Sequence, residues 1–286
     1  MASGGLRYQY ARLNIAEKMI AINVIIFIAI GLLTRLVSPA IEGWFVLPAN
    51  LTNFLSQPWS LVSYGFLHSG ILHLLWNMYV LYISGRILLN LFDNKRFINV
   101  YFLGIMLGGM FFLLTDALFL QSNSVLLGAS AGVMAVLIFV CTYIPNQEIR
   151  VIFFNVKLWQ VGLFVVLIDL LQISSGGSNF GGRIAHLGGA LLGYLYARQL
   201  MNGRDIGEGF SKFLDGLANM FKSKEKKAPL KTVYKNKASA SRIKVKQDKD
   251  SHQHQIDTIL DKISKSGYES LSKAEKDFLF KAGKKD

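Results

Sequence analysis

The sequence predicts an all-α fold: a polytopic membrane protein with a bundle of six transmembrane helices and a short cytoplasmic helical tail. Three observations favour this class. Of the 286 residues, 52% are hydrophobic, the apolar residues gather in six long runs, and the basic residues concentrate toward one end of the chain. Because the bilayer core holds no water to bind backbone N–H and C=O groups, each run long enough to cross it is expected to be a helix.

The apolar runs also set the expected domain boundaries. The predicted spans are 17–37, 70–91, 97–118, 128–145, 158–174 and 183–201. The expected regions are a cytoplasmic N-terminal segment (1–16), a six-helix domain (17–203), an amphipathic helix with a basic flexible linker (204–250) and a small helical module (251–286). The first run follows a polar start without an obvious cleavage site, so it is expected to remain as a signal anchor.

The connection between the first two spans, residues 38–69, is unusually long. Its prolines exclude a single helix, and its aromatic side chains include Trp44 and Trp59. Aromatic residues of this kind are typical of an element that lies in the membrane interface. A loop of this length in a compact protein is usually functional.

Two stretches of the tail carry apolar residues at helical spacing. Between 206 and 221 they form one stripe, which is typical of a helix on a membrane surface. Between 253 and 283 two short helices are expected, with Ser270 or Ser272 as the N-cap of the second and Glu275 close behind. Two short helices bury little core, so this module is expected to dock on a cytoplasmic partner that the sequence does not identify.

The charge distribution indicates lipid contact. The chain has a formal net charge of +13, and residues 204–286 contribute +8 of it, with 20 Lys and Arg against 12 Asp and Glu. A cationic stretch directly after apolar helices is typical of a protein that meets anionic lipid headgroups, and we expect no nucleic-acid partner. Basic residues also flank the spans on one side, which predicts that both termini are cytoplasmic.

Ser130 opens the fourth span between Gly128 and Gly132. Taken alone, this small-residue pattern is more typical of close helix packing than of a nucleophile. Polar side chains near the outer ends of other spans favour the second interpretation, because such groups are costly in hydrocarbon and are functional candidates. They are His68 and His73, Asn77 four residues further along the same helix, and His186.

These residue types support acyl transfer. A serine hydroxyl becomes nucleophilic when a neutral imidazole removes its proton. His73, Asn77 and the Ser130 backbone N–H are candidate donors to the oxyanion that forms. Asp116 and Asp169 lie near outer helix ends, and the sequence leaves open whether either assists, so the predicted catalytic unit is a Ser-His dyad.

Other catalytic classes fit the sequence less well. The only cysteine, Cys141, lies inside an apolar run and no His-Glu-x-x-His motif occurs, so no metal or cofactor is expected. A soluble α/β-hydrolase shares the Gly-x-Ser-x-Gly pattern but requires a strand before the serine and alternating strands and helices, and the six long apolar spans argue against that. A transporter or proton relay would also use intramembrane histidines, but it would leave unexplained the order in which three motifs with these residues follow one another along the chain.

Three motifs together resemble those of the rhomboid family of intramembrane serine proteases. They are His73-x-x-x-Asn77, Gly128-Ala-Ser130-Ala-Gly132, and the run Gly181-Gly-Arg-Ile-Ala-His186-Leu-Gly-Gly189. The resemblance implies that Ser130 is the nucleophile and His186 the general base, with an acyl-enzyme intermediate. It implies that His73 and Asn77 stabilise the oxyanion and that Gly128 shapes the loop before Ser130. His68 also fits a family position.

The same resemblance implies substrates and a location. Family members cleave transmembrane proteins at or near the outer face of the membrane. The tail resembles a short helical module on bacterial rhomboids, which predicts the bacterial cytoplasmic (inner) membrane. The alternative function is a proteolytically inactive rhomboid-like protein that binds membrane clients; such relatives usually lack the nucleophile or the base, and this chain has both.

Overall fold

The computed structural model describes residues 5–151, 154–176, 179–220 and 253–283. The chain divides into two compact units, residues 1–222 and 223–286, which are described separately. The predicted basic linker, residues 222–250, lies outside the described residues.

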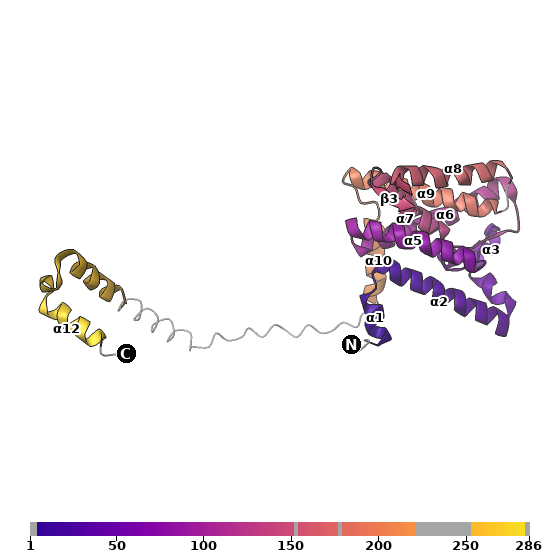
Figure 1. The fold of residues 1–286 in the computed structure, drawn as a ribbon. Helices are drawn as coiled ribbons and strands as arrows, with labels where there is room; N and C mark the ends of the chain where they lie inside the picture. Colours follow the sequence, from indigo (N-terminus) through magenta and orange to yellow (C-terminus); the bar gives the residue numbers. More distant parts are fainter. Residues whose placement is uncertain (1–4, 152–153, 177–178, 221–252, 284–286) are drawn as a thin grey trace. The chain divides into compact units, whose positions relative to one another are not determined.

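The predicted all-α class is confirmed: in the described residues, one helix lies on each of the six predicted runs (Figure 1). They are α2 (Ile15–Leu36), α5 (Ile71–Leu91), α6 (Asn94–Thr115), α7 (Ser130–Tyr143), α8 (Leu158–Ser174) and α9 (Phe180–Met201). A short α1 (Leu6–Arg12) comes first, and a π-helical turn, η3 (Asp116–Leu120), prolongs α6. By length and composition α2, α5 and α6 with its extension qualify as membrane spans, whereas α7 and α8 are apolar but shorter.

Helix α7 is the centre of the bundle and packs against α5, α6, α8 and α9. All its residues from Ala131 to Cys141 are buried. It has 14 residues, fewer than the predicted span, because Gly128 adopts a positive φ before it and Pro145 disfavours helical geometry at Ile144. A helix of this length covers about 21 Å, less than the ~30 Å hydrocarbon core, so its polar start is expected to lie below the headgroups.

Glycines bring α6, α7 and α9 into backbone contact. A Cβ atom added to Gly189 would overlap the carbonyl oxygen of Ala131, and one added to Gly193 would overlap that of Ala135. Small residues allow this approach where two membrane helices cross. The α7–α9 contact therefore fixes the depth of α9 against the first turn of α7.

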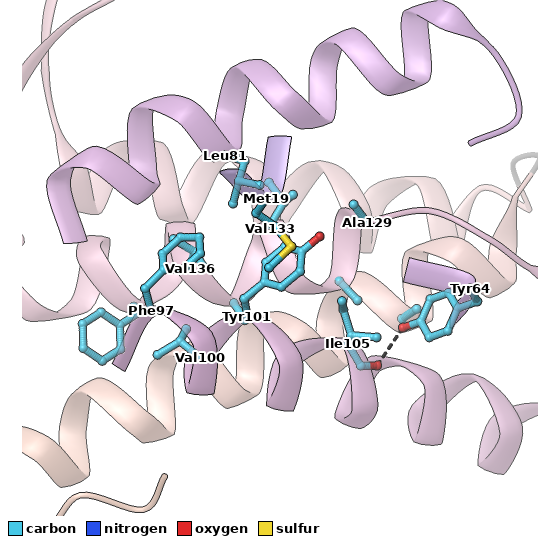
Figure 2. Close-up of a cluster of buried hydrophobic side chains, with 14 of the residues drawn as sticks. Met19, Tyr64, Leu81, Phe97, Val100, Tyr101, Ile105, Ala129, Val133 and Val136 are labelled. Carbon is cyan, nitrogen blue, oxygen red and sulfur yellow. Dashed lines mark hydrogen bonds between the residues drawn. The ribbon is translucent and has the colours of Figure 1, made fainter. Parts of the chain in front are cut away.

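Around this contact the core is aromatic and aliphatic (Figure 2). Phe97 and Tyr101 on α6 are buried and stacked with ring centroids 6.1 Å apart, and Val136 of α7 is buried in the same cluster. Tyr64 is also buried, and its hydroxyl donates a hydrogen bond to the Ile105 carbonyl at 2.7 Å. That hydrogen bond ties the long first connection to α6.

Residues 38–69 fold into short elements rather than one helix, as the prolines predict. They are η1 (Pro39–Trp44), β1 (Leu47–Pro48), α3 (Leu51–Ser56), α4 (Ser60–Ser63) and η2 (Tyr64–Phe66). Trp44 and Trp59 are exposed and stacked, and Trp59 Nε1 donates to the Trp44 carbonyl at 2.8 Å. Exposed stacked indoles suit the membrane interface.

Two small antiparallel ladders lie outside the sequence prediction. Strand β1 pairs with β2 (Val125–Leu126), and β3 (Glu148–Val151) pairs with β4 (Phe154–Lys157) between α7 and α8. Strands of two to four residues are too short to show a clear alternation of apolar and polar residues. The β1–β2 ladder joins the long first connection to the residues that lead into α7.

The predicted amphipathic helix is present as α10 (Glu208–Met220) and is anchored to α6. Asn99 Nδ2 donates to Ser211 Oγ at 2.8 Å and to the Gly207 carbonyl at 3.1 Å. Before the helix, Asp205 pairs with Arg96 and accepts a hydrogen bond from the Tyr196 hydroxyl. Apolar side chains of α10, among them that of Met220, remain exposed.

The second unit contains helical residues 253–266, η4 (Tyr268–Ser270) and α12 (Lys273–Ala282). Of the two predicted N-cap residues, Ser272 caps α12 in a capping box with Glu275. Lys262 reaches Glu275 at 2.9 Å across the two helices. Hydrogen bonds from Lys262 and from Ser272 lower the pKa of Glu275 to about 2.

We expect Gly189→Leu to destabilise the bundle, because the new side chain must push α9 away from the Ala131 carbonyl. Overpacking of this kind costs about 1–3 kcal/mol or more. The measurement is the Tm of the purified protein in detergent. Gly31→Leu on α2 is the matched control, since nothing lies within 4 Å of a Cβ added there. Equal Tm values for the two variants would contradict the packing account.

Two truncations separate the roles of the tail. Removal of residues 223–286 is expected to leave the Tm of the bundle unchanged, because those residues form a separate compact unit. Removal of residues 204–286 is expected to lower it, because the buried Asn99 and Tyr196 lose partners on α10 and on Asp205. Each polar group left unsatisfied costs about 1–3 kcal/mol. Identical Tm values for both truncations would show that α10 is not anchored in this way.

Candidate functional site

The backbone ahead of Ser130 is held by the long first connection. The Gly128 N–H donates to the Tyr64 carbonyl at 3.0 Å, and the Ala49 N–H donates to the Ser124 carbonyl at 2.9 Å beside the β1–β2 ladder. Ser130 is then the first residue of α7 and is half-buried. The N–H groups of a first helical turn have no partner within the helix, so the Ser130 N–H is available as a donor.

Gly128 lies against the imidazole of His73. It adopts φ +130°, which favours glycine, and a Cβ added to it would be 2.9 Å from His73 Cε1 and 3.1 Å from Nε2. The same point is 3.5 Å from Ser130 Oγ. The His73 ring and the Ser130 hydroxyl therefore lie within 3.5 Å of one point next to Gly128, although they come from different helices.

His73 itself is oriented by neighbours on its own segment. Its Nδ1 is 3.1 Å from the Ser69 hydroxyl, so the Nε2 edge is the one that faces Gly128. The His68 ring meets it edge-on with centroids 5.1 Å apart. His68 is 7% exposed, and within the described residues neither of its ring nitrogens has a hydrogen-bond partner.

Asn77 is one turn further along α5 and is buried. Its side-chain amide donates to the His73 carbonyl at 3.0 Å, which occupies one of its two N–H groups. The second N–H is the one that remains for an incoming group. The predicted oxyanion role of Asn77 stays a prediction.

His186 is carried to the same end of the bundle by α9. Its neighbour Ala185 lies against Gly108 of α6, and Gly189, one turn later, lies against Ala131, the residue that follows Ser130. Among the described residues no hydrogen bond joins Ser130 and His186.

The geometry distinguishes the two acids that the sequence left open. Asp169 of α8 is buried, with Oδ2 3.0 Å from His186 Nδ1 and Oδ1 2.7 Å from Arg183 Nη1. Asp116 is also buried, but its carboxylate accepts hydrogen bonds from the N–H and hydroxyl of Ser122 and holds the turn after η3. Only Asp169 touches a candidate site residue.

Sequence reasoning missed Ser69 and Arg183. The spacing in the sequence could have indicated both residues. Ser69 precedes His73 by four residues. Arg183 precedes His186 by three residues on a helix, so the two side chains lie on the same face. No group of three or more His, Cys, Asp or Glu side chains in the described ranges is arranged to hold a metal ion. What the site combines is a hydroxyl, imidazoles and a buried carboxylate.

Comparison with known proteins gives two family matches. Residues 55–203, just over half of the chain, match the rhomboid domain, and residues 243–284 match a family of unknown function (DUF6576). The first match contains the candidate site residues on α5, α7 and α9. The second covers the described helices of the tail unit.

Curated relatives agree with the first match. The chain is 30% identical over 154 residues to presenilin-associated rhomboid-like protein A, mitochondrial, of Danio rerio, covering 52% of this chain and 38% of the relative. It is 29% identical over 170 residues to RHOMBOID-like protein 12, mitochondrial, of Arabidopsis thaliana, covering 54% and 50%. The chain thus spans about a third to a half of the length of the curated relatives it matches.

These relatives correct one prediction. The expected bacterial cytoplasmic membrane is wrong on this comparison, because the relatives carry mitochondrial names in animals and in a plant. The prediction rested on the resemblance of a short tail to a module on bacterial rhomboids, which does not identify a membrane, and basic flanks indicate only on which side of a membrane a loop lies. Together, the fold and the rhomboid domain match show that the chain belongs to the rhomboid family.

Proposed function

We propose that this protein is an intramembrane serine endopeptidase that cleaves transmembrane proteins, with Ser130 as nucleophile and His186 as general base. The observation that supports the proposal best is the meeting of three helices at one end of the bundle. There α7 contributes Ser130, α5 contributes His73 against Gly128, and α9 contributes His186 three residues before the contact between Gly189 and Ala131.

The reaction that these groups support is peptide hydrolysis in two steps. His186 accepts the Ser130 hydroxyl proton while Oγ bonds to the carbonyl carbon of the substrate. The C–N bond then breaks, and the same proton passes from His186 to the leaving amine, which leaves an acyl-enzyme. A water molecule, deprotonated by His186, attacks the ester carbon; Oγ departs and regains the proton, and a carboxylic acid is released.

The negative charge that develops on the carbonyl oxygen of the substrate must be stabilised by hydrogen-bond donors that are already in position. The Ser130 N–H opens a helix whose N-terminus carries partial positive charge, and the Nε2 edge of His73 faces the same point near Gly128. Asn77 supplies the N–H that His73 does not occupy. A single donor of this type is worth roughly 100–1,000-fold in kcat.

The substrate class follows from where the site lies. The bundle exposes large apolar side chains such as Leu72, Phe119 and Leu171 on its helices, so its outer surface suits lipid. A peptide that reaches Ser130 from the surrounding lipid is itself in the bilayer. Membership of the rhomboid family implies transmembrane substrates as well, in agreement with this reasoning.

We expect Ser130→Ala and His186→Ala each to abolish cleavage of a transmembrane reporter substrate in proteoliposomes without a change in Tm, because each removes one partner of the proton transfer. The matched controls are Ser174→Ala and His254→Ala, at exposed positions outside the site. Cleavage at wild-type rate by either site variant would refute the proposal and leave client binding without proteolysis as the remaining function.

Gly128→Ala is expected to lower kcat/KM by roughly 100-fold or more, the scale of one lost transition-state donor. The methyl group lies too close to His73 and the backbone resists φ +130°, so the His73 ring and the Ser130 hydroxyl must separate. The measurement is reporter cleavage in detergent. Gly216→Ala on α10 is the control, since nothing lies within 4 Å of its added Cβ. An unimpaired Gly128→Ala enzyme would show that this contact does not matter for the reaction.

A further inference from the structure

One buried carboxylate contacts the proposed base from a helix that carries none of the other proposed site residues. The Asp169 side chain on α8 is 4% exposed. Its Oδ2 lies 3.0 Å from His186 Nδ1, and its Oδ1 accepts a hydrogen bond from Arg183 Nη1 at 2.7 Å. Arg183 and His186 are three residues apart on α9 and share a face. Each oxygen of the carboxylate thus has one partner on α9.

This contact selects one tautomer of His186. An ionised carboxylate accepts hydrogen bonds and donates none, so the imidazole hydrogen is held on Nδ1. The lone pair is then on Nε2, the nitrogen that remains for the Ser130 proton. In the other tautomer Nε2 carries a hydrogen and accepts nothing.

The Arg183 guanidinium stabilises the charged form of Asp169 at this buried position. A buried carboxylate without a partner is strongly unfavourable, and a guanidinium at 2.7 Å offsets much of that cost. Because Arg183 binds Oδ1, the second oxygen remains for His186. The arginine is therefore part of the same arrangement, although it touches the carboxylate and not the imidazole.

We propose that Asp169 is the positioning residue for His186, so that hydrolysis depends on a Ser130–His186–Asp169 relay and not on two residues alone. This inference rests on the proposed function and adds a third member to it. During acylation the Ser130 O–H bond breaks as the His186 Nε2–H bond forms. The proton on Nδ1 stays in place beside the carboxylate, which stabilises the imidazolium and is not itself protonated.

The test is Asp169→Asn, measured by reporter cleavage in detergent together with Tm. The amide keeps the size of the side chain but also offers an N–H to Nδ1, which allows the unproductive tautomer. We expect kcat to fall by about 10,000-fold with KM unchanged, the scale found when an aspartate of this kind is replaced by asparagine in a serine protease. A residue that only links α8 to α9 would change Tm without this selective loss of kcat.

The double variant Asp169→Asn/Arg183→Gln keeps the test valid if the single variant does not fold. It replaces a buried ion pair by two neutral amides, so no uncompensated charge remains. It is expected to fold and to show a kcat as low as that of Asp169→Asn. Wild-type kcat in either folded variant would overturn the relay.

The failure of this inference is distinguishable from failure of the proposed function. If Ser130→Ala abolishes cleavage while folded Asp169→Asn retains the wild-type kcat, the proposed protease function is supported and the positioning role of Asp169 is refuted. If Ser130→Ala cleaves as fast as wild type, both the proposed function and the positioning role of Asp169 are refuted. Loss of kcat at constant KM in Asp169→Asn, with Ser130→Ala inactive, supports both.

Discussion

The backbone contact between α7 and α9 is the constraint on which the rest of the structure depends. Gly189 has no side chain where α9 crosses the Ala131 carbonyl, and any larger residue would hold the two helices apart. Because Ser130 and His186 lie within one turn of this crossing, the contact sets them at one depth in the bundle. In a bilayer apolar side chains gain little by meeting one another instead of lipid, so close packing of this kind is what determines where helices cross.

A second constraint concerns the loop before Ser130. Polar backbone groups below the headgroups need partners within the protein. The β1–β2 ladder and the Gly128–Tyr64 hydrogen bond supply them, and Tyr64 is tied in turn to the Ile105 carbonyl. The long connection that precedes α5 is thus a support for the start of α7 as well as a candidate interface element.

Much of this was predictable from the sequence, and the limits have physical causes. Long apolar runs identify membrane helices because the bilayer imposes length and hydrogen bonding, and all six runs carry helices. The short ladder at Leu47 and Leu126 was not predictable, because its pairing depends on contacts between distant segments. The Asp169–His186 contact was not predictable either, since it requires the rotation of α8 about its axis, which sequence does not give.

The Ser130 hydroxyl group is the proposed nucleophile, and covalent labelling tests its reactivity most directly. A fluorophosphonate reacts with a serine that an adjacent base has activated. Mass spectrometry of the labelled wild-type protein is predicted to find the adduct on Ser130, and to find none when His186 is replaced by Ala. An adduct on another serine, or equal labelling of Ser130 without His186, would contradict the account.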